Sequence, residues 1–150
     1  MKPELFWKLS TLCYRRGWVI PAKLLKTFNY FIFRAVLPYE IELGENVSLW
    51  HRGLGVVIHP NIAIGDNVSI AHGVTIAGTV KGMSHIGNNV TIGSGVQIIP
   101  RREQPFTVGE NAIIGAGSTV IGDVPASSIT RGERAVPRTS NPSPTSSNVS

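Results

Sequence analysis

Two of the four histidines in this chain occupy equivalent positions in a spaced pattern. His51 and His72 each lie two residues after an aliphatic residue, and Ser94 and Ala116 hold the same position after later aliphatic residues. An imidazole accepts or donates a proton near neutral pH, so histidines at such positions suit general acid–base chemistry. This chemistry requires that the fold bring the four residues to one place.

The pattern that spaces them is an internal repeat of about six residues. Aliphatic residues recur at Leu43, Leu49, Ile58, Ile64, Ile70, Ile76, Ile86, Ile92, Ile98, Val108, Ile114 and Val120. Three residues later the chain has Asn46, Asn61, Asn67, Gly73, Asn89, Gly95, Asn111 and Gly117. Asparagine and glycine tolerate a left-handed backbone, so a tight turn is expected in each of these units.

Such a unit predicts a short strand, a corner and another short strand. A helix would spread the aliphatic column around its surface, because its period is 3.6 residues. Three units closing a triangle make one coil, and coils stack through parallel ladders. The twelve units therefore predict an all-β solenoid of about four coils. In that solenoid the residues at 51, 72, 94 and 116 form a column with a spacing of about 4.8 Å.

The exceptions to the turn column mark three loops and the end of the repeat. They are Arg52, Thr79, Arg101 and Asp123. The loops at 78–85 and 100–107 fall at the same corner of successive coils, so they should project as neighbours. The loop after Leu49 falls at an adjacent corner, and we expect Asp123 to close the solenoid.

The stretches LGENVSL, IGDNVSI, IGNNVTIGSG and VGENAIIGAGSTVIGDVP resemble the hexapeptide-repeat acyltransferases over residues 41 to about 136. The L-x-H motif at 49–51, followed by GVVIHP and VTIAG, resembles the serine acetyltransferase branch and its relatives that acetylate sugars of bacterial surface polysaccharides. This resemblance implies a left-handed parallel β-helix, a homotrimer, acetyl-CoA as the acetyl donor and no metal ion.

The resemblance also suggests roles for individual residues. His51 matches the family's catalytic histidine, which makes it the candidate general base, and the column places His72 near the thioester. Coenzyme A would lie between two solenoids and contact Gly78, Thr79, His85, Ser94, Gly95, Ala116, Arg131 and Arg134, with Arg101 and Arg102 as alternative phosphate contacts. We expect His59 to make a structural hydrogen bond.

Two departures from the serine acetyltransferase pattern concern the acceptor. Trp50 stands where an aspartate precedes the family's histidine, and Val36 lies near the position of a second aspartate. Glu40 and Glu42 are the acids nearest to Val36 in sequence. An indole stacks well on the apolar side of a sugar, so Trp50 favours a saccharide hydroxyl as the acceptor, with serine as the alternative.

The flanks of the repeat differ from it in composition. We predict a helical segment at 1–38, the β-helix at 39–137 and a disordered tail at 138–150. Two helices are expected at 4–16 and 21–37. Residues 1–35 hold seven of the 14 basic residues of this chain, which has a net charge of +5. The helices are expected to cap the solenoid and pack against sister subunits, or to contact an anionic membrane surface.

Other classes fit the sequence less well. One cysteine, Cys13, excludes an internal disulfide, and without a leader sequence we expect a cytoplasmic protein. The basic residues are not accompanied by a nucleic-acid reading motif. A zinc carbonic anhydrase would need three converging histidines, and a non-catalytic scaffold would have uninterrupted corners. These two alternatives remain open to zinc analysis and to an activity assay.

Overall fold

The computed structural model describes residues 2–132, in which two helices precede a parallel β-solenoid of about four coils. The predicted tail at 138–150 and the end of the predicted β-helix lie outside the described residues. The helices are α1 (Pro3–Arg15) and α2 (Val19–Phe33), and two 3-10 turns are η1 (Trp50–Gly53) and η2 (Arg101–Glu103). The strands are β1 (Glu42–Leu43), β2 (Ser48–Leu49), β3 (Val57–Ile58), β4 (Ile62–Ile64), β5 (Ser69–Ile70), β6 (Thr75–Ile76), β7 (Ser84–Ile86), β8 (Thr91–Ile92), β9 (Gln97–Ile99), β10 (Thr107–Val108), β11 (Ile113–Ile114), β12 (Thr119–Ile121) and β13 (Ile129–Thr130).

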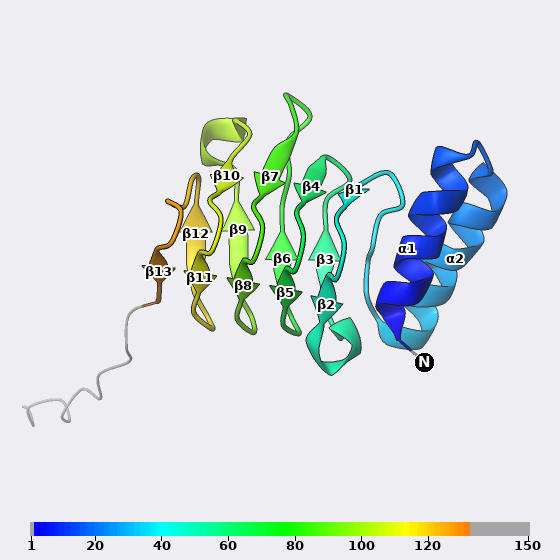
Figure 1. Ribbon diagram of the computed structural model, residues 1–150, viewed down its shortest axis with the longest axis horizontal. Coiled ribbons are helices and arrows are strands. Elements are labelled where there is room, and N and C mark those ends of the chain that lie inside the picture. Colours follow the sequence, from blue (N-terminus) through cyan, green and yellow to red (C-terminus); the bar gives the residue numbers. More distant parts are fainter. Residues whose placement is uncertain (1, 133–150) are drawn as a thin grey trace, which may run out of the picture.

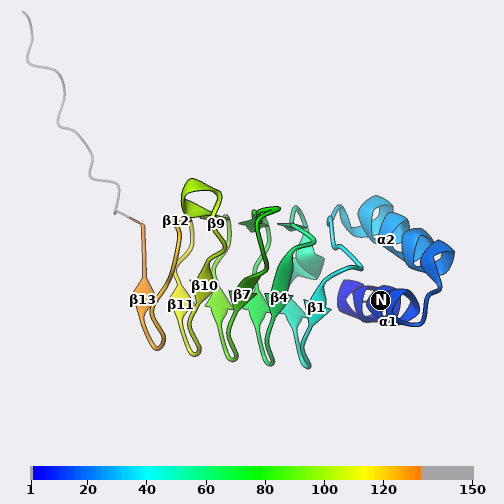
Figure 2. The ribbon, with the colours of Figure 1, turned by 90° about the horizontal axis from the view of Figure 1, so that it is seen from above.

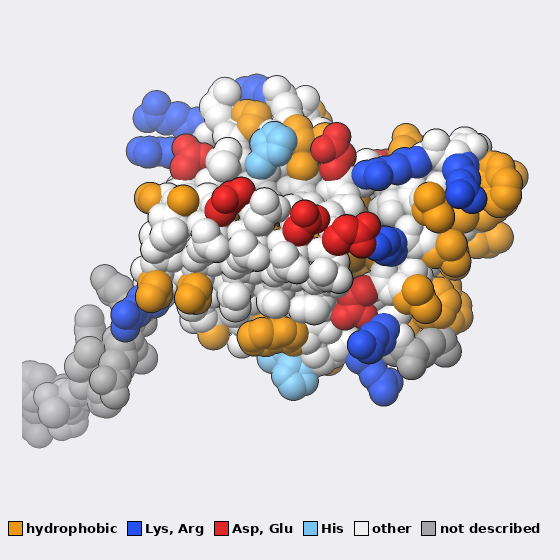
Figure 3. All heavy atoms as spheres, in the orientation of Figure 1, with side chains coloured by type: hydrophobic (Ala, Val, Ile, Leu, Met, Phe, Trp, Pro, Cys, Tyr) orange, Lys and Arg blue, Asp and Glu red, His pale blue; other side chains and the backbone are white. Residues whose placement is uncertain are grey.

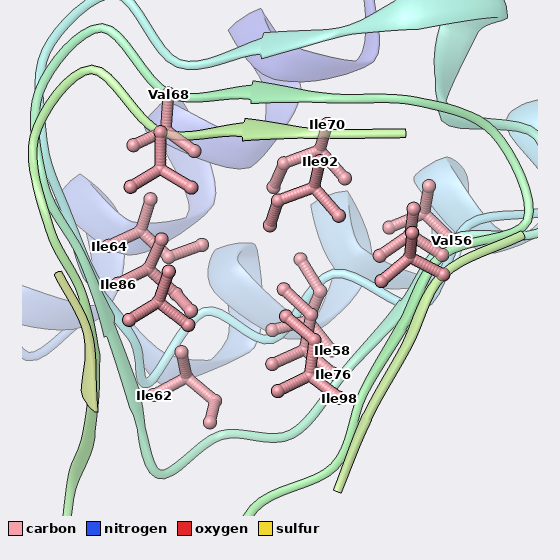
Figure 4. Close-up of a cluster of buried hydrophobic side chains, with 14 of the residues drawn as sticks. Val56, Ile58, Ile62, Ile64, Val68, Ile70, Ile76, Ile86, Ile92 and Ile98 are labelled. Carbon is pink, nitrogen blue, oxygen red and sulfur yellow. The ribbon is translucent and has the colours of Figure 1, made fainter. Parts of the chain in front are cut away.

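The strands form three parallel sheets (Figure 1), and each sheet makes one side of a triangular coil (Figure 4). Sheet A has the order β12-β9-β6-β3, sheet B the order β1-β4-β7-β10, and sheet C the order β13-β11-β8-β5-β2. The predicted aliphatic residues lie inside and stack on one another. Figure 4 shows Ile58, Ile76 and Ile98 in one stack, with Ile64 above Ile86 and Ile70 beside Ile92 in the other two. The six-residue repeat thus buries a continuous apolar core.

The solenoid extends beyond the twelve predicted units. Asp123 was expected to end it, but Val124 forms a parallel bridge with Val108, and β13 pairs with β11 on sheet C. The Asp123 carboxylate instead accepts a hydrogen bond from the backbone N–H of Thr107 at 2.8 Å. This side chain therefore helps to hold the last turn against the coil before it.

Most predicted turn residues have the left-handed conformation. Asn46, Asn67, Asn89 and Asn111 stack at the corner between sheets B and C, and their side-chain amides form a ladder with N···O distances of 3.2, 3.3 and 3.2 Å. Asn61 was predicted to belong with them, and this was wrong, because it has no positive φ. Its amide Nδ2 donates to the carbonyl oxygen of Thr79 at 2.9 Å, so its side chain ties neighbouring coils instead.

The loops at 78–85 and 100–107 project side by side from the corner between sheets A and B, as predicted. The Thr79 hydroxyl donates to the backbone carbonyl of Glu103 at 2.7 Å, and Lys81 Nζ lies 3.0 Å from Glu103 Oε2. The first loop, η1, lies at the adjacent corner between sheets C and A. This separation leaves the η1 corner free of the two larger projections.

The helices lie at the β1 end of the solenoid (Figure 2). Trp7 of α1 is fully buried there, and its Nε1 donates to the carbonyl oxygen of Pro38 at 2.8 Å. The prediction of 21–37 for the second helix was wrong at both ends. Pro21 fits within the first turn, where its missing N–H costs no hydrogen bond, and Arg34 ends the helix with a φ of 56°. Within residues 2–132, neither helix has the length and apolar character needed to cross a bilayer.

Candidate active site

Sheet C delivers the predicted column to the corner where it meets sheet A. Its ladder pairs Leu49 with Ile70, Ile70 with Ile92, and Ile92 with Ile114. The residues two positions further along, His51, His72, Ser94 and Ala116, therefore occupy one corner of four successive coils. The column predicted from the repeat is confirmed.

The two histidines of the column are in contact. The rings of His51 and His72 meet edge to face, with centroids 4.9 Å apart and planes at 88°. Both side chains are exposed, so solvent or a substrate reaches them. The pair thus offers two adjacent imidazoles at the surface, each able to hold or release a proton.

The backbone that presents His51 is left-handed, a conformation that Arg102 and Glu103 of the η2 loop share. His51 has φ 52° and ψ 36°, and Arg52 follows with φ 59° and ψ 27°, so two consecutive non-glycine residues are left-handed. A left-handed non-glycine residue costs roughly 1–2 kcal/mol. Strain of this kind persists where the surrounding structure holds it, and it is common at functional sites. The η1 loop therefore holds the imidazole of His51 at a defined place beside His72.

The part of the column in the later coils, at Ser94 and Ala116, has little side-chain bulk. Ser94 is half-buried and Ala116 is exposed. Gly95 and Gly117 follow with φ values of 66° and 71°, and no heavy atom lies within 4 Å of where a Cβ would stand on either of them. A strip of accessible backbone thus runs along the solenoid from the histidine pair.

The structure does not bring every predicted contact residue to this corner. Gly78 and Thr79 lie at the corner between sheets A and B, beside a hollow of about 380 Å³ lined also by Ile99 and Pro100. His85 is exposed on β7 of sheet B, and Arg131 follows β13 near Gly115 of the preceding coil. Arg134 lies outside the described residues. Among the predicted contact residues that the structure describes, Ser94, Gly95, Ala116 and Arg131 lie along the edge that carries the histidine pair.

The expected structural role of His59 is confirmed. Its Nδ1 accepts a hydrogen bond from the backbone N–H of Asn61 at 3.1 Å. Gly78 packs against the same ring so closely that a Cβ there would lie 2.3 Å from Nδ1. Among the described residues, no three His, Cys, Asp or Glu side chains are grouped so as to hold a metal ion.

Among the described residues, neither Glu40 nor Glu42, the acids nearest to Val36 in sequence, hydrogen-bonds to the strand end before His51. Glu42 belongs to β1 of sheet B, and Glu40 lies beside Tyr39, where burial and then the Glu40 carboxylate raise the pKa of the Tyr39 hydroxyl above 10.0. The acid that reaches the corner is Glu4 of α1, whose Oε1 accepts the backbone N–H of Leu49 at 2.7 Å. Sequence reasoning missed Glu4 because 45 residues separate it from Leu49.

Fold and site together define a class of protein, the left-handed parallel β-helix proteins built from hexapeptide repeats. No family model matches the chain. The chain is similar to the serine acetyltransferase of Helicobacter pylori (strain ATCC 700392 / 26695), with 34% identity over 77 residues, which are 51% of this chain and 44% of that enzyme.

Solved structures extend the similarity over most of the chain. The serine acetyltransferase of Neisseria gonorrhoeae in complex with serine has a TM-score of 0.77 and 31% identity, over 90% of this chain and 55% of that one. The enzyme of Brucella abortus strain S19 in complex with coenzyme A has a TM-score of 0.74 and 31% identity, over 88% and 52%. The chain thus spans about half the length of the serine acetyltransferases that it resembles.

Proposed function

We propose that this protein transfers an acetyl group from acetyl-CoA to a hydroxyl group of a small acceptor. The observation that carries the proposal is the contact between His51 and His72 at the start of a strip of accessible backbone. The similarity to serine acetyltransferases, one of them solved with coenzyme A, supports the same activity.

In the proposed reaction His51 acts as the general base. It takes the hydroxyl proton as the acceptor oxygen attacks the thioester carbonyl carbon, and a carbon–oxygen bond forms. The carbon–sulfur bond then breaks, and the proton passes from His51 to the departing sulfur, so that coenzyme A leaves as a thiol. His72, in contact with His51, orients the acceptor or donates to the oxyanion. The reaction needs no covalent enzyme intermediate.

The strip above the histidines suits the donor. The pantetheine arm of coenzyme A is an extended chain with amide groups, and exposed backbone at Gly95 and Ala116 offers hydrogen-bond partners for them. A guanidinium matches phosphate oxygens, so Arg131, or Arg101 and Arg102, would meet the nucleotide end. In the homotrimer that we propose, Gly78, Thr79 and His85 reach the donor from a neighbouring solenoid.

The acceptor has two candidates. The relatives are serine acetyltransferases, and this favours serine over the saccharide that the sequence alone favoured. A saccharide stays as the second candidate because Trp50, next to His51, exposes 47% of its surface and can stack on a sugar ring. The histidine chemistry is the same for both acceptors.

The N-terminal helices suggest a further contact, which we propose to be with an anionic membrane surface. On α2, Ile20, Leu24 and Phe31 are 74%, 65% and 64% exposed and lie on one side of the helix. Apolar side chains gather over the two helices, with basic side chains around them (Figure 3). An apolar face with a basic rim is typical of interfacial helices.

The release of coenzyme A thiol from acetyl-CoA tests the proposed activity. Purified protein is mixed with serine, sugar nucleotides or glycan fragments, and the thiol is measured with a colour reagent. We expect release with one acceptor class and only the hydrolysis background in its absence. If none of these acceptors raises thiol release above background, the proposed activity is wrong.

A further inference from the structure

The first coil of the solenoid has an edge that another element must cover. In a parallel sheet, each strand exchanges hydrogen bonds with a neighbour on both sides, and an edge strand leaves one row of groups unpaired. Strand β2 is the edge of sheet C, and its Ser48 N–H donates to Val68 of the next coil at 2.9 Å. The following N–H, that of Leu49, points toward the side where no coil precedes it.

Glu4 takes the place of the missing coil. Its Oε1 accepts the Leu49 N–H at 2.7 Å, so the carboxylate supplies the hydrogen bond that a preceding strand would have given. Its second oxygen, Oε2, is buried and has no hydrogen-bond partner among the described residues. A buried unpaired carboxylate oxygen is costly.

Leu49 is the last residue before the histidine turn. Trp50 and the left-handed residues His51 and Arg52 follow directly. The strand end is therefore fixed on one side by the ladder to Ile70 and on the other by Glu4. A hollow of about 430 Å³ lies between these elements, lined by Lys2, Pro3, Glu4, Leu49 and Arg52.

We propose that Glu4 is a positioning residue for the histidine pair. By holding the Leu49 N–H, it fixes the point from which the strained η1 turn departs, and with it the ring of His51 against His72. Its effect on catalysis rests on the proposed function, whereas its effect on ring geometry does not. Helix α1 thereby becomes part of the site, because it carries the Glu4 carboxylate that fixes the start of the η1 turn.

Three variants separate this role from simple docking of the helix. Glu4→Ala removes the acceptor for the Leu49 N–H, and Glu4→Gln keeps an oxygen at the same reach without the charge. Glu45→Ala is the matched control, because it removes the ion pair between α1 and the solenoid that Glu45 forms with Lys8, away from the histidine turn. Should Glu4→Ala fail to fold, Glu4→Asp draws the carboxylate back by one methylene and serves in its place.

The first readout is the NMR signal of each of the four histidine rings, observed at Cε1–Hε1. Glu4→Ala or Glu4→Asp should move the signals of His51 and His72 and leave those of His59 and His85 in place. Glu4→Gln and Glu45→Ala should leave all four in place. Unmoved His51 and His72 signals in the Glu4→Ala protein, or equal movement in the control, would overturn the proposal.

The second readout is steady-state kinetics with acetyl-CoA. Small displacements of a catalytic group are expensive, so Glu4→Ala should lower kcat by at least about tenfold. The KM for acetyl-CoA should stay within about twofold, because the backbone strip belongs to later coils. If the ring signals move as expected but the wild-type protein transfers no acetyl group, the positioning role stands and the proposed function fails. A rise in the acceptor KM with unchanged kcat would show that Glu4 binds the acceptor instead, and this would overturn the positioning role.

Discussion

The imidazole rings of His51 and His72 meet edge to face across two successive coils, with their centroids 4.9 Å apart. The two residues are 21 positions apart in sequence, and the ladder between β2 and β5 brings them together. This places a candidate base beside a second proton-carrying group at the surface.

Replacing His51 should remove most of the acetyl transfer without unfolding the protein. Asparagine is the best replacement, because it lacks the imidazole but tolerates the φ of 52° at this position. We expect the His51→Asn protein to lose a factor of about 10² to 10⁴ in kcat, the usual contribution of a general base. Calorimetric binding of coenzyme A and the melting temperature should match those of the wild type. Turnover close to the wild-type value in a folded His51→Asn protein contradicts the proposed base.

A side chain added at Gly95 should obstruct the donor. Gly95 has a φ of 66° and open space around it, so Gly95→Asn adds bulk above the histidines with little effect on the turn. The KM for acetyl-CoA should rise by about tenfold, an effect of roughly 1.4 kcal/mol, while the melting temperature changes little. Gly17→Asn is the control, since Gly17 has a φ of 80° and equally open space in the turn between α1 and α2. An unchanged KM in Gly95→Asn shows that the donor binds elsewhere.

Trp50 distinguishes the two acceptor candidates. If the indole stacks on a sugar, Trp50→Ala should raise the KM for a saccharide by about two- to tenfold, because an aromatic contact is worth about 0.5–1.5 kcal/mol. The kinetics with serine should not change. Leu54→Ala is the control for loss of an exposed apolar side chain in the same loop, where Leu54 is 55% exposed. Equal effects on both acceptors, or on neither, would exclude a stacking role for Trp50.

The exposed face of the helices should carry the membrane contact. We expect the wild-type protein to co-sediment with phosphatidylglycerol vesicles. The double variant Leu24→Ser/Phe31→Ser removes two large apolar side chains from α2 and should lose this co-sedimentation. Ile121→Ser/Ile129→Ser is the control, because both isoleucines are similarly exposed but lie in the last strands of the solenoid. Wild-type binding should weaken in high salt, since basic side chains contribute to it.

A different outcome would assign that face to another subunit. If the wild-type protein binds no vesicles and the Leu24→Ser/Phe31→Ser variant has a smaller mass by light scattering, the helices pack against sister subunits. That result would contradict the proposed lipid contact and would support the assembly.

The sequence by itself determined the repeat and its consequences. Six-residue spacing places an aliphatic side chain inside at every strand, and asparagine or glycine at the corners permits the left-handed turn. Register then follows, because a slip between coils would move the aliphatic residues out of the core. The stacking of His51, His72, Ser94 and Ala116, and the shared corner of the second and third loops, could therefore be predicted from spacing alone.

Only the tertiary structure decided how the first coil is closed and which acid reaches the histidine turn. Asn61 has the right residue type for a left-handed corner, but its amide finds a partner in Thr79 of the next loop and its backbone stays out of that conformation. Glu4 has no local signal, since its partner Leu49 is 45 residues away and depends on how α1 docks. A repeat specifies contacts between equivalent positions of successive coils. The docking of helix α1, which is not part of the repeat, depends instead on packing against the first coil and on the unpaired N–H of Leu49. Both exist only once that coil has formed.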